Sequence, residues 1–126
     1  MVTKDADGTW NEDLCTSGYV GYGGVGETTE WNRKTPRGQF SFTYAFGILP
    51  NPGTELSYTQ VDDTYYWVDD VNSRYYNQSS RRRQRRNLEF PGGCISVPED
   101  QMITILKNVQ PGCQIIIDSA SELKNY

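Results

Sequence analysis

The feature that most constrains the fold is the stretch GQFSFTYAFG at 38–47, in which aromatic residues alternate with small or polar ones. Successive side chains of a strand point to opposite sides, so this periodicity of two predicts a β-strand with one aromatic face in the core. The aromatic positions are Phe40, Phe42, Tyr44 and Phe46. The stretch TYYWVDD at 64–70 predicts a second aromatic strand.

The composition also favours β-structure in one domain spanning 1–126. Nine tyrosines suit half-buried strands, and 12 glycines with 6 prolines provide frequent turns. A chain of 126 residues is the usual size of a single domain. Near the start, Asp7-Gly8 predicts a type I′ hairpin turn between two short strands.

One helix and a last strand are predicted near the C-terminus. Ser96 and Glu99 have the spacing of a capping box before a helix at 98–109. Its apolar stripe would consist of Met102, Ile103, Leu106 and Val109. Pro111-Gly112 would end this region, and the isoleucines that follow predict a buried strand at 114–118.

Three cysteines, Cys15, Cys94 and Cys113, stand at irregular spacing, without a CxxC pair and without any histidine. This pattern argues against a zinc site. One disulfide with a remaining thiol, or three free thiols, are both compatible with it. No segment has the roughly 18 apolar residues of a membrane span. The opening residues also lack the apolar core of a signal peptide, so either the chain is cytosolic as written or an export signal lay upstream.

The motifs follow one another in an order that resembles the catalytic domain of L,D-transpeptidases. A glycine-rich turn at 18–26 leads into KTPRGQF at 34–40, which is similar to the K-T-P-x-G-x-F motif of that family. The segments NPGTELSYTQV and YYWVDDVNSRYYNQ continue in the manner of one bacterial subgroup. PGGCISVPEDQMITILK at 91–107 is similar to the segment around the catalytic cysteine of the family.

The resemblance implies a mainly β, sandwich or barrel-like domain with one short helix. It implies a cysteine acyltransferase of peptidoglycan cross-linking, without cofactor or metal, acting on stem peptides outside the cytoplasm. Cys94 would be the nucleophile, and the backbone N–H groups near Gly93 and Cys94 would be candidates for the oxyanion hole. Gly92 and Gly93 permit a tight turn, and a helix N-terminus close by would stabilise the thiolate.

The chain departs from the family between 79 and 90. Family members carry several dozen residues there, including the histidine that serves as the base of the cysteine, and this chain has no histidine. The resemblance therefore implies a domain that lacks this segment. A truncation at the N-terminus is also expected, because the chain starts only a few residues before the Asp7-Gly8 turn and the first strand would be stunted. Acyl transfer would be weak or absent, because loss of a general base costs about 10²–10⁴-fold in rate.

The run RRRQRR at 81–86 leaves an alternative function open. It predicts an exposed loop at 79–87, because clustered arginines repel one another and cannot all be paired when buried. Arginine pairs well with anionic groups, so the chain could be a non-catalytic module that binds the cell wall or another anionic polymer. The binding residues would be Arg81, Arg82, Arg83, Arg85 and Arg86. The chain has 12 basic and 16 acidic residues, and the part outside this run has a formal net charge of −9, which argues against nucleic acid.

Overall fold

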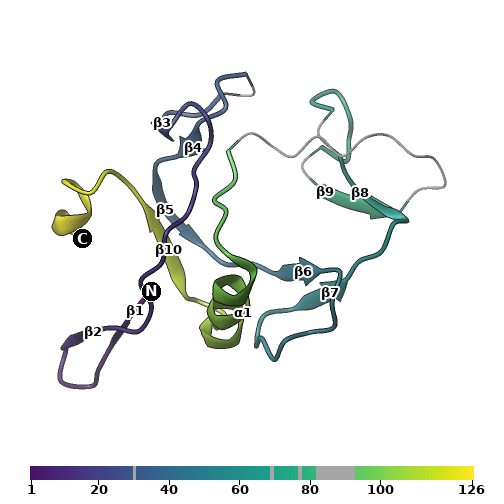
Figure 1. Ribbon diagram of the computed structural model, residues 1–126. Helices are drawn as coiled ribbons and strands as arrows, with labels where there is room; N and C mark the ends of the chain where they lie inside the picture. Colours follow the sequence, from purple (N-terminus) through teal and green to yellow (C-terminus); the bar gives the residue numbers. More distant parts are fainter. Residues whose placement is uncertain (30, 69, 77, 82–92) are drawn as a thin grey trace.

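The computed structural model describes residues 1–29, 31–68, 70–76, 78–81 and 93–126, with side chains described for all of these except 80 and 81 (Figure 1). Its elements are β1 (Val2–Lys4), β2 (Trp10–Glu12), β3 (Val25–Gly26), β4 (Thr35–Pro36), β5 (Gly38–Ser41), β6 (Ala45–Gly47), β7 (Tyr58–Gln60), β8 (Tyr65–Val68), β9 (Gln78–Arg81), α1 (Glu99–Asn108), β10 (Gln114–Ile117) and the 3₁₀ turn η1 (Leu123–Asn125).

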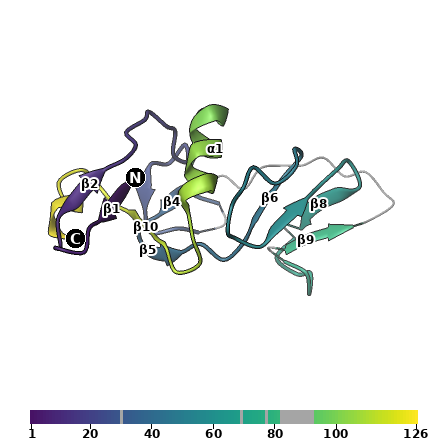
Figure 2. The same ribbon diagram turned by 90° about the horizontal axis from the view of Figure 1, so that it is seen from below.

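The described strands form five two-stranded sheets: β1–β2, β3–β4, β5–β10, β6–β7 and β8–β9. The β3–β4 and β6–β7 pairs are parallel and the other three are antiparallel. Both views place β1–β2 and β8–β9 at opposite ends of the molecule, with α1 between them (Figures 1 and 2). For residues outside the undescribed positions, a mainly β protein with one α-helix is confirmed, and the sheets formed by the described strands do not close into a barrel.

The stretch 38–47 is split into two strands, not one as predicted. β5 pairs with β10, placing Phe40 opposite Ile115, whereas β6 pairs with β7, placing Phe46 opposite Thr59. The two strands have different partners, so the chain changes course between them. The structure therefore divides the predicted strand at residues 42–44.

The prediction that all four aromatic residues of this stretch face the core is also wrong. Phe42 packs against the core, whereas Phe40, Tyr44 and Phe46 are 39%, 42% and 50% exposed. In place of core contacts, the rings of Tyr44 and Phe46 lie 6.0 Å apart, and those of Phe46 and Trp67 lie 6.1 Å apart. Each sheet has only two strands and covers little surface, so these aromatic side chains remain partly exposed to solvent.

The first hairpin forms as predicted but with a different turn. Asp5 N donates to Thr9 O at 2.8 Å, and Gly8 N donates to Asp5 O at 2.9 Å. Gly8 has a φ of +91°, whereas Asp7 keeps a negative φ, and a type I′ turn requires positive φ at both central residues. The type I′ prediction is therefore wrong. Asp7 instead accepts a hydrogen bond from Thr9 N at 2.9 Å, a local contact that fixes the turn.

The predicted helix and last strand are both present, but the strand is not buried as predicted, since Gln114 and Ile116 are exposed, and the predicted capping box is absent. α1 covers Glu99–Asn108, its N-cap is Pro98, and no side chain caps it. Ser96 cannot serve as the cap because it lies two residues before the N-cap, and its backbone pairs with Tyr19. Leu106 and Val109 of the predicted stripe lie in or against the core together with Ile105, whereas Met102 is 37% exposed, so the predicted stripe is correct only in part.

The core is small for a chain of this size. Ala45, Leu56 and Val109 are its buried hydrophobic residues among those described, and Cys113 packs against them. The accessible surface is 10224 Å². A compact monomer of 14.4 kDa exposes about 6,800 Å². The chain thus keeps far more surface in contact with solvent than a closed domain does.

Candidate functional site around Cys94

An isolated antiparallel bridge joins the glycine-rich turn to the cysteine segment. Tyr19 N donates to Ser96 O, and Ser96 N donates to Tyr19 O, both at 2.8 Å. Gly18 lies so close to this bridge that an added Cβ would be 2.8 Å from Ser96 O. The bridge therefore requires a glycine at position 18. It also fixes the backbone at Ser96, two residues after Cys94.

The Lys34-Thr35 motif contacts the same segment from another direction. A Cβ added at Gly93 would lie 2.6 Å from Lys34 O and 3.7 Å from the Thr35 Cα, so the two backbones touch. No residue other than glycine fits there unless the backbone shifts. Two of the motifs behind the family resemblance, far apart in sequence, are thus in direct contact beside Cys94.

Thr35 fixes the glycine-rich turn beneath this contact. Its side chain is 1% exposed, and its Oγ1 accepts a hydrogen bond from Gly21 N at 2.8 Å. Thr35 N donates to Gly24 O at 2.9 Å, and β4 pairs with β3 through Val25. Sequence reasoning noted Thr35 as part of a motif but missed its positioning role. The pairing of Tyr19 with Ser96 was not predicted either, because no local sequence pattern indicates an isolated bridge.

Cys94 itself is exposed and has no protein partner in the described part of the chain. Its Sγ makes no hydrogen bond with the described residues, and the Gly93 and Cys94 amides donate to no acceptor among them. Two adjacent N–H groups without acceptors can stabilise an oxyanion. An exposed thiol beside them is accessible to a carbonyl substrate, so the arrangement is compatible with acyl transfer.

The helix does not assist Cys94 as predicted. α1 begins at Glu99, and its N-cap Pro98 lies four positions after Cys94, not two as the predicted cap at Ser96 required. The first turn also carries Glu99 and Asp100, whose carboxylates offset the positive end of the helix dipole. Activation of the thiol by the helix is therefore not supported.

The arginine run is described only at its beginning. Ser79, Ser80 and Arg81 belong to β9, where Arg81 pairs with Tyr65 of β8, so the predicted loop starts at least three residues later than 79. Arg82, Arg83, Arg85 and Arg86 lie outside the described residues. A binding surface made by these arginines thus stays a prediction.

A metal site is not found in the described ranges, where no three Cys, Asp or Glu side chains are grouped around one point. All three cysteines are free thiols. No helix among the described residues is long and apolar enough to cross a membrane. A shallow hollow of about 440 Å³ is lined by Ile48, Gln60, Val61, Asp62 and Asp63. None of these residues belongs to the Cys94 site.

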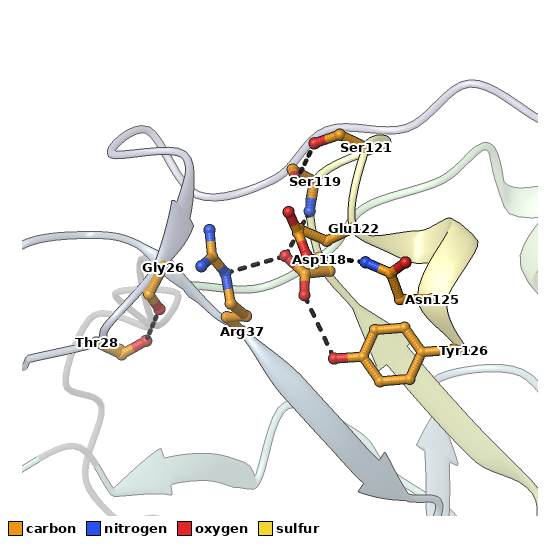
Figure 3. A network of polar contacts seen from close by, with 9 residues as sticks. All are labelled: Gly26, Thr28, Arg37, Asp118, Ser119, Ser121, Glu122, Asn125 and Tyr126. Carbon is orange, nitrogen blue, oxygen red and sulfur yellow. Dashed lines mark hydrogen bonds and ion pairs between the residues drawn. The ribbon is translucent and has the colours of Figure 1, made fainter.

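A second polar cluster lies where β10 ends (Figure 3). The Asp118 side chain, 7% exposed, accepts from Arg37 Nε at 3.0 Å, from Ser119 N at 2.7 Å and from Tyr126 Oη at 3.3 Å. Asn125 also donates to Glu122 at 3.1 Å. These contacts tie the C-terminal segment to the loop residue between β4 and β5, and they leave the carboxylate fully paired.

No family model, no curated protein and no solved structure matches this chain. Assignment of Cys94 as a nucleophile therefore depends on the order of the motifs and on the contact of Gly93 with Lys34.

Proposed function

We propose that this chain is an L,D-transpeptidase-like protein of bacterial peptidoglycan, of the mainly β fold of that family, in which Cys94 accepts an acyl group. The observation that carries the proposal is the backbone contact between Gly93 and Lys34. This contact brings the cysteine loop and the K-T-P motif to one place. The partners would be peptidoglycan stem peptides, and the site of action would be outside the cytoplasm.

The reaction would begin when the Cys94 thiolate attacks the carbonyl carbon of a stem-peptide bond. The Gly93 and Cys94 amides would donate to the oxyanion that forms. Collapse of this intermediate would expel the terminal D-alanine, whose amine takes a proton from solvent, and would leave a thioester on Cys94. The amine of a neighbouring stem would then attack the thioester and release the thiol as a cross-link forms.

Turnover should be slow because the chain has no imidazole to move protons. The chain contains no histidine, and loss of a general base costs about 10²–10⁴-fold in rate. The thiolate is the reactive form, so acylation should quicken as the pH rises. The resolving amine also needs a base, so the acyl-enzyme should accumulate.

Intact-mass spectrometry after incubation with a carbapenem or a stem-peptide donor tests this proposal. We expect a stable adduct that forms faster at higher pH, disappears in Cys94→Ala and gives little cross-linked product. Absence of an adduct together with binding to intact wall would overturn the proposal in favour of a non-catalytic module. Cross-linking at ordinary enzyme rates would show that another residue replaces the imidazole.

A further inference from the structure

β10 has one open edge with unpaired backbone groups. Phe42 N donates to Cys113 O, so Ile115 and Ile117 face β5 in its hydrogen-bond ladder, whereas Gln114 and Ile116 point their N–H and C=O groups the other way. No backbone bond from the described residues reaches the Gln114 or Ile116 groups on this edge. An open edge of this kind can pair with a further strand.

We propose that this edge pairs with the same edge of a second copy of the chain, in the antiparallel order β5–β10–β10′–β5′. A two-fold axis at Ile115 would place Gln114 opposite Ile116 of the second copy. Because both residues point their backbone groups outward, the pairing would form four hydrogen bonds between the copies. Ile115 would lie opposite its own counterpart, a favourable pair of β-branched side chains. This inference is independent of the proposed function.

The charges at this edge permit two copies to approach. The sequence of β10 is Gln-Ile-Ile-Ile, which contains no charged residue and no proline. Asp118 follows it directly, but its carboxylate is paired with Arg37 at 3.0 Å, so the two-fold arrangement does not bring two unpaired carboxylates together. Of the other described strands, β1, β2 and β4 contain Lys4, Glu12 or Pro36, which discourage pairing, whereas β5, β6, β7 and β8 carry no charge or proline.

The surface area also fits a second copy. The chain exposes 10224 Å², about 3,400 Å² more than a compact monomer of its mass. A stable interface removes about 800 Å² from each partner. A dimer could therefore bury this much and still leave each copy with more surface than a closed domain. Ile116, 36% exposed, lies on β10 next to the proposed partner strand and would be partly covered.

Sedimentation analysis over a range of concentrations tests the proposal. We expect a monomer–dimer equilibrium in the unaltered chain, which Ile116→Pro weakens at least about tenfold, because proline removes the Ile116 N–H from both copies. Ser41→Pro is the matched control, since the Ser41 N–H points to the other edge of the same sheet and should not affect the equilibrium.

Two outcomes would overturn the pairing: a monomer at about 100 µM, the weak end of specific association, or a dimer that Ile116→Pro and Ser41→Pro weaken equally. If Ile116→Pro fails to fold, hydrogen exchange of the unaltered chain decides the matter. The Gln114 and Ile116 amides should exchange more slowly as the concentration rises, whereas the Gln39 and Ser41 amides should not change. Equal rates at all concentrations would contradict the proposal.

Discussion

Cys94 and Asp118 show opposite ways in which this chain uses a polar group. Asp118 is 7% exposed and accepts bonds from Arg37, Ser119 and Tyr126. Cys94 is exposed, makes no hydrogen bond with the described residues, and lies beside two amides without acceptors. A carboxylate whose lone pairs are satisfied contributes to stability, whereas unused donors beside a thiol are available to a ligand. The difference separates a structural cluster from a candidate reactive one.

Gly93→Ala should have the largest effect on the reactivity of Cys94. Gly93→Ala places a Cβ 2.6 Å from Lys34 O, so the backbone that carries the Gly93 and Cys94 amides must shift. We expect acylation of Cys94 to fall by about tenfold or more, as for loss of an oxyanion donor. Stability should fall by roughly 1–3 kcal/mol, as for an overpacked site. Mass spectrometry and thermal unfolding measure the two effects.

Gly112→Ala is the matched control for this substitution. Gly112 has a φ of +98° but open space around it, so alanine is strained there without touching another segment. We expect a loss of stability of about 1 kcal/mol and unchanged acylation. If both variants slow acylation equally, then Gly93 has no special role beside Cys94.

Asp118→Ala should give the next largest effect, on stability alone. The substitution leaves the Arg37 guanidinium without its partner and removes two acceptor bonds of a buried carboxylate, which costs about 1–3 kcal/mol. Arg37→Ala should cost less, since Arg37 is 50% exposed and water can replace part of its interaction. Chemical denaturation measures both. A change in Cys94 acylation in either variant would show that the Asp118 cluster affects the reactivity of Cys94, contrary to our expectation.

The smallest effect concerns the first hairpin at low pH. The backbone hydrogen bond from Thr9, joined by one from the Thr9 side chain, holds the pKa of Asp7 below its ordinary value. The carboxylate is therefore favoured in the folded hairpin. The contribution of the Asp7 carboxylate to the stability of the hairpin is present above the pKa of unfolded Asp, about 3.9. It is lost as the pH falls through the lower pKa of the folded state.

Trp10 on β2 reports this transition by fluorescence. We expect a loss of hairpin structure in the unaltered chain as the pH falls below about 4. In Asp7→Asn this step should be absent, because the amide oxygen still accepts from Thr9 but does not titrate. An identical acid transition in both proteins would show that another group causes it.

Local patterns in the sequence predicted the elements that depend on local chemistry. The helix at 98–109, the strand at 114–118 and the hairpin across Asp7-Gly8 are all present, since periodicity and turn residues act over a few positions. What failed depends on partners distant in sequence. The stretch 38–47 divides because β5 and β6 pair with different strands, and its aromatic residues stay exposed because no second layer covers them.

The candidate site shows the same division. Cys94 and Gly93 were identified from a motif, but the contact of Gly93 with Lys34 and the bridge of Tyr19 to Ser96 are visible only in three dimensions. The capping box failed because the helix begins at Glu99, which leaves Ser96 two residues before the N-cap. A backbone bridge involves no particular side chain, so no residue type predicts it.

Competition between two thiols in one molecule tests whether the surroundings of Cys94 make its thiol reactive. Cys15 and Cys94 are both exposed free cysteines, but only Cys94 lies beside the Gly93–Lys34 contact. After brief exposure to a carbapenem, peptide mapping gives the fraction of each thiol that is acylated. We predict that Cys94 is modified at least about tenfold faster than Cys15, as expected for one added oxyanion site. Equal rates at the two thiols would contradict the account, since Cys94 would then react only as an exposed cysteine.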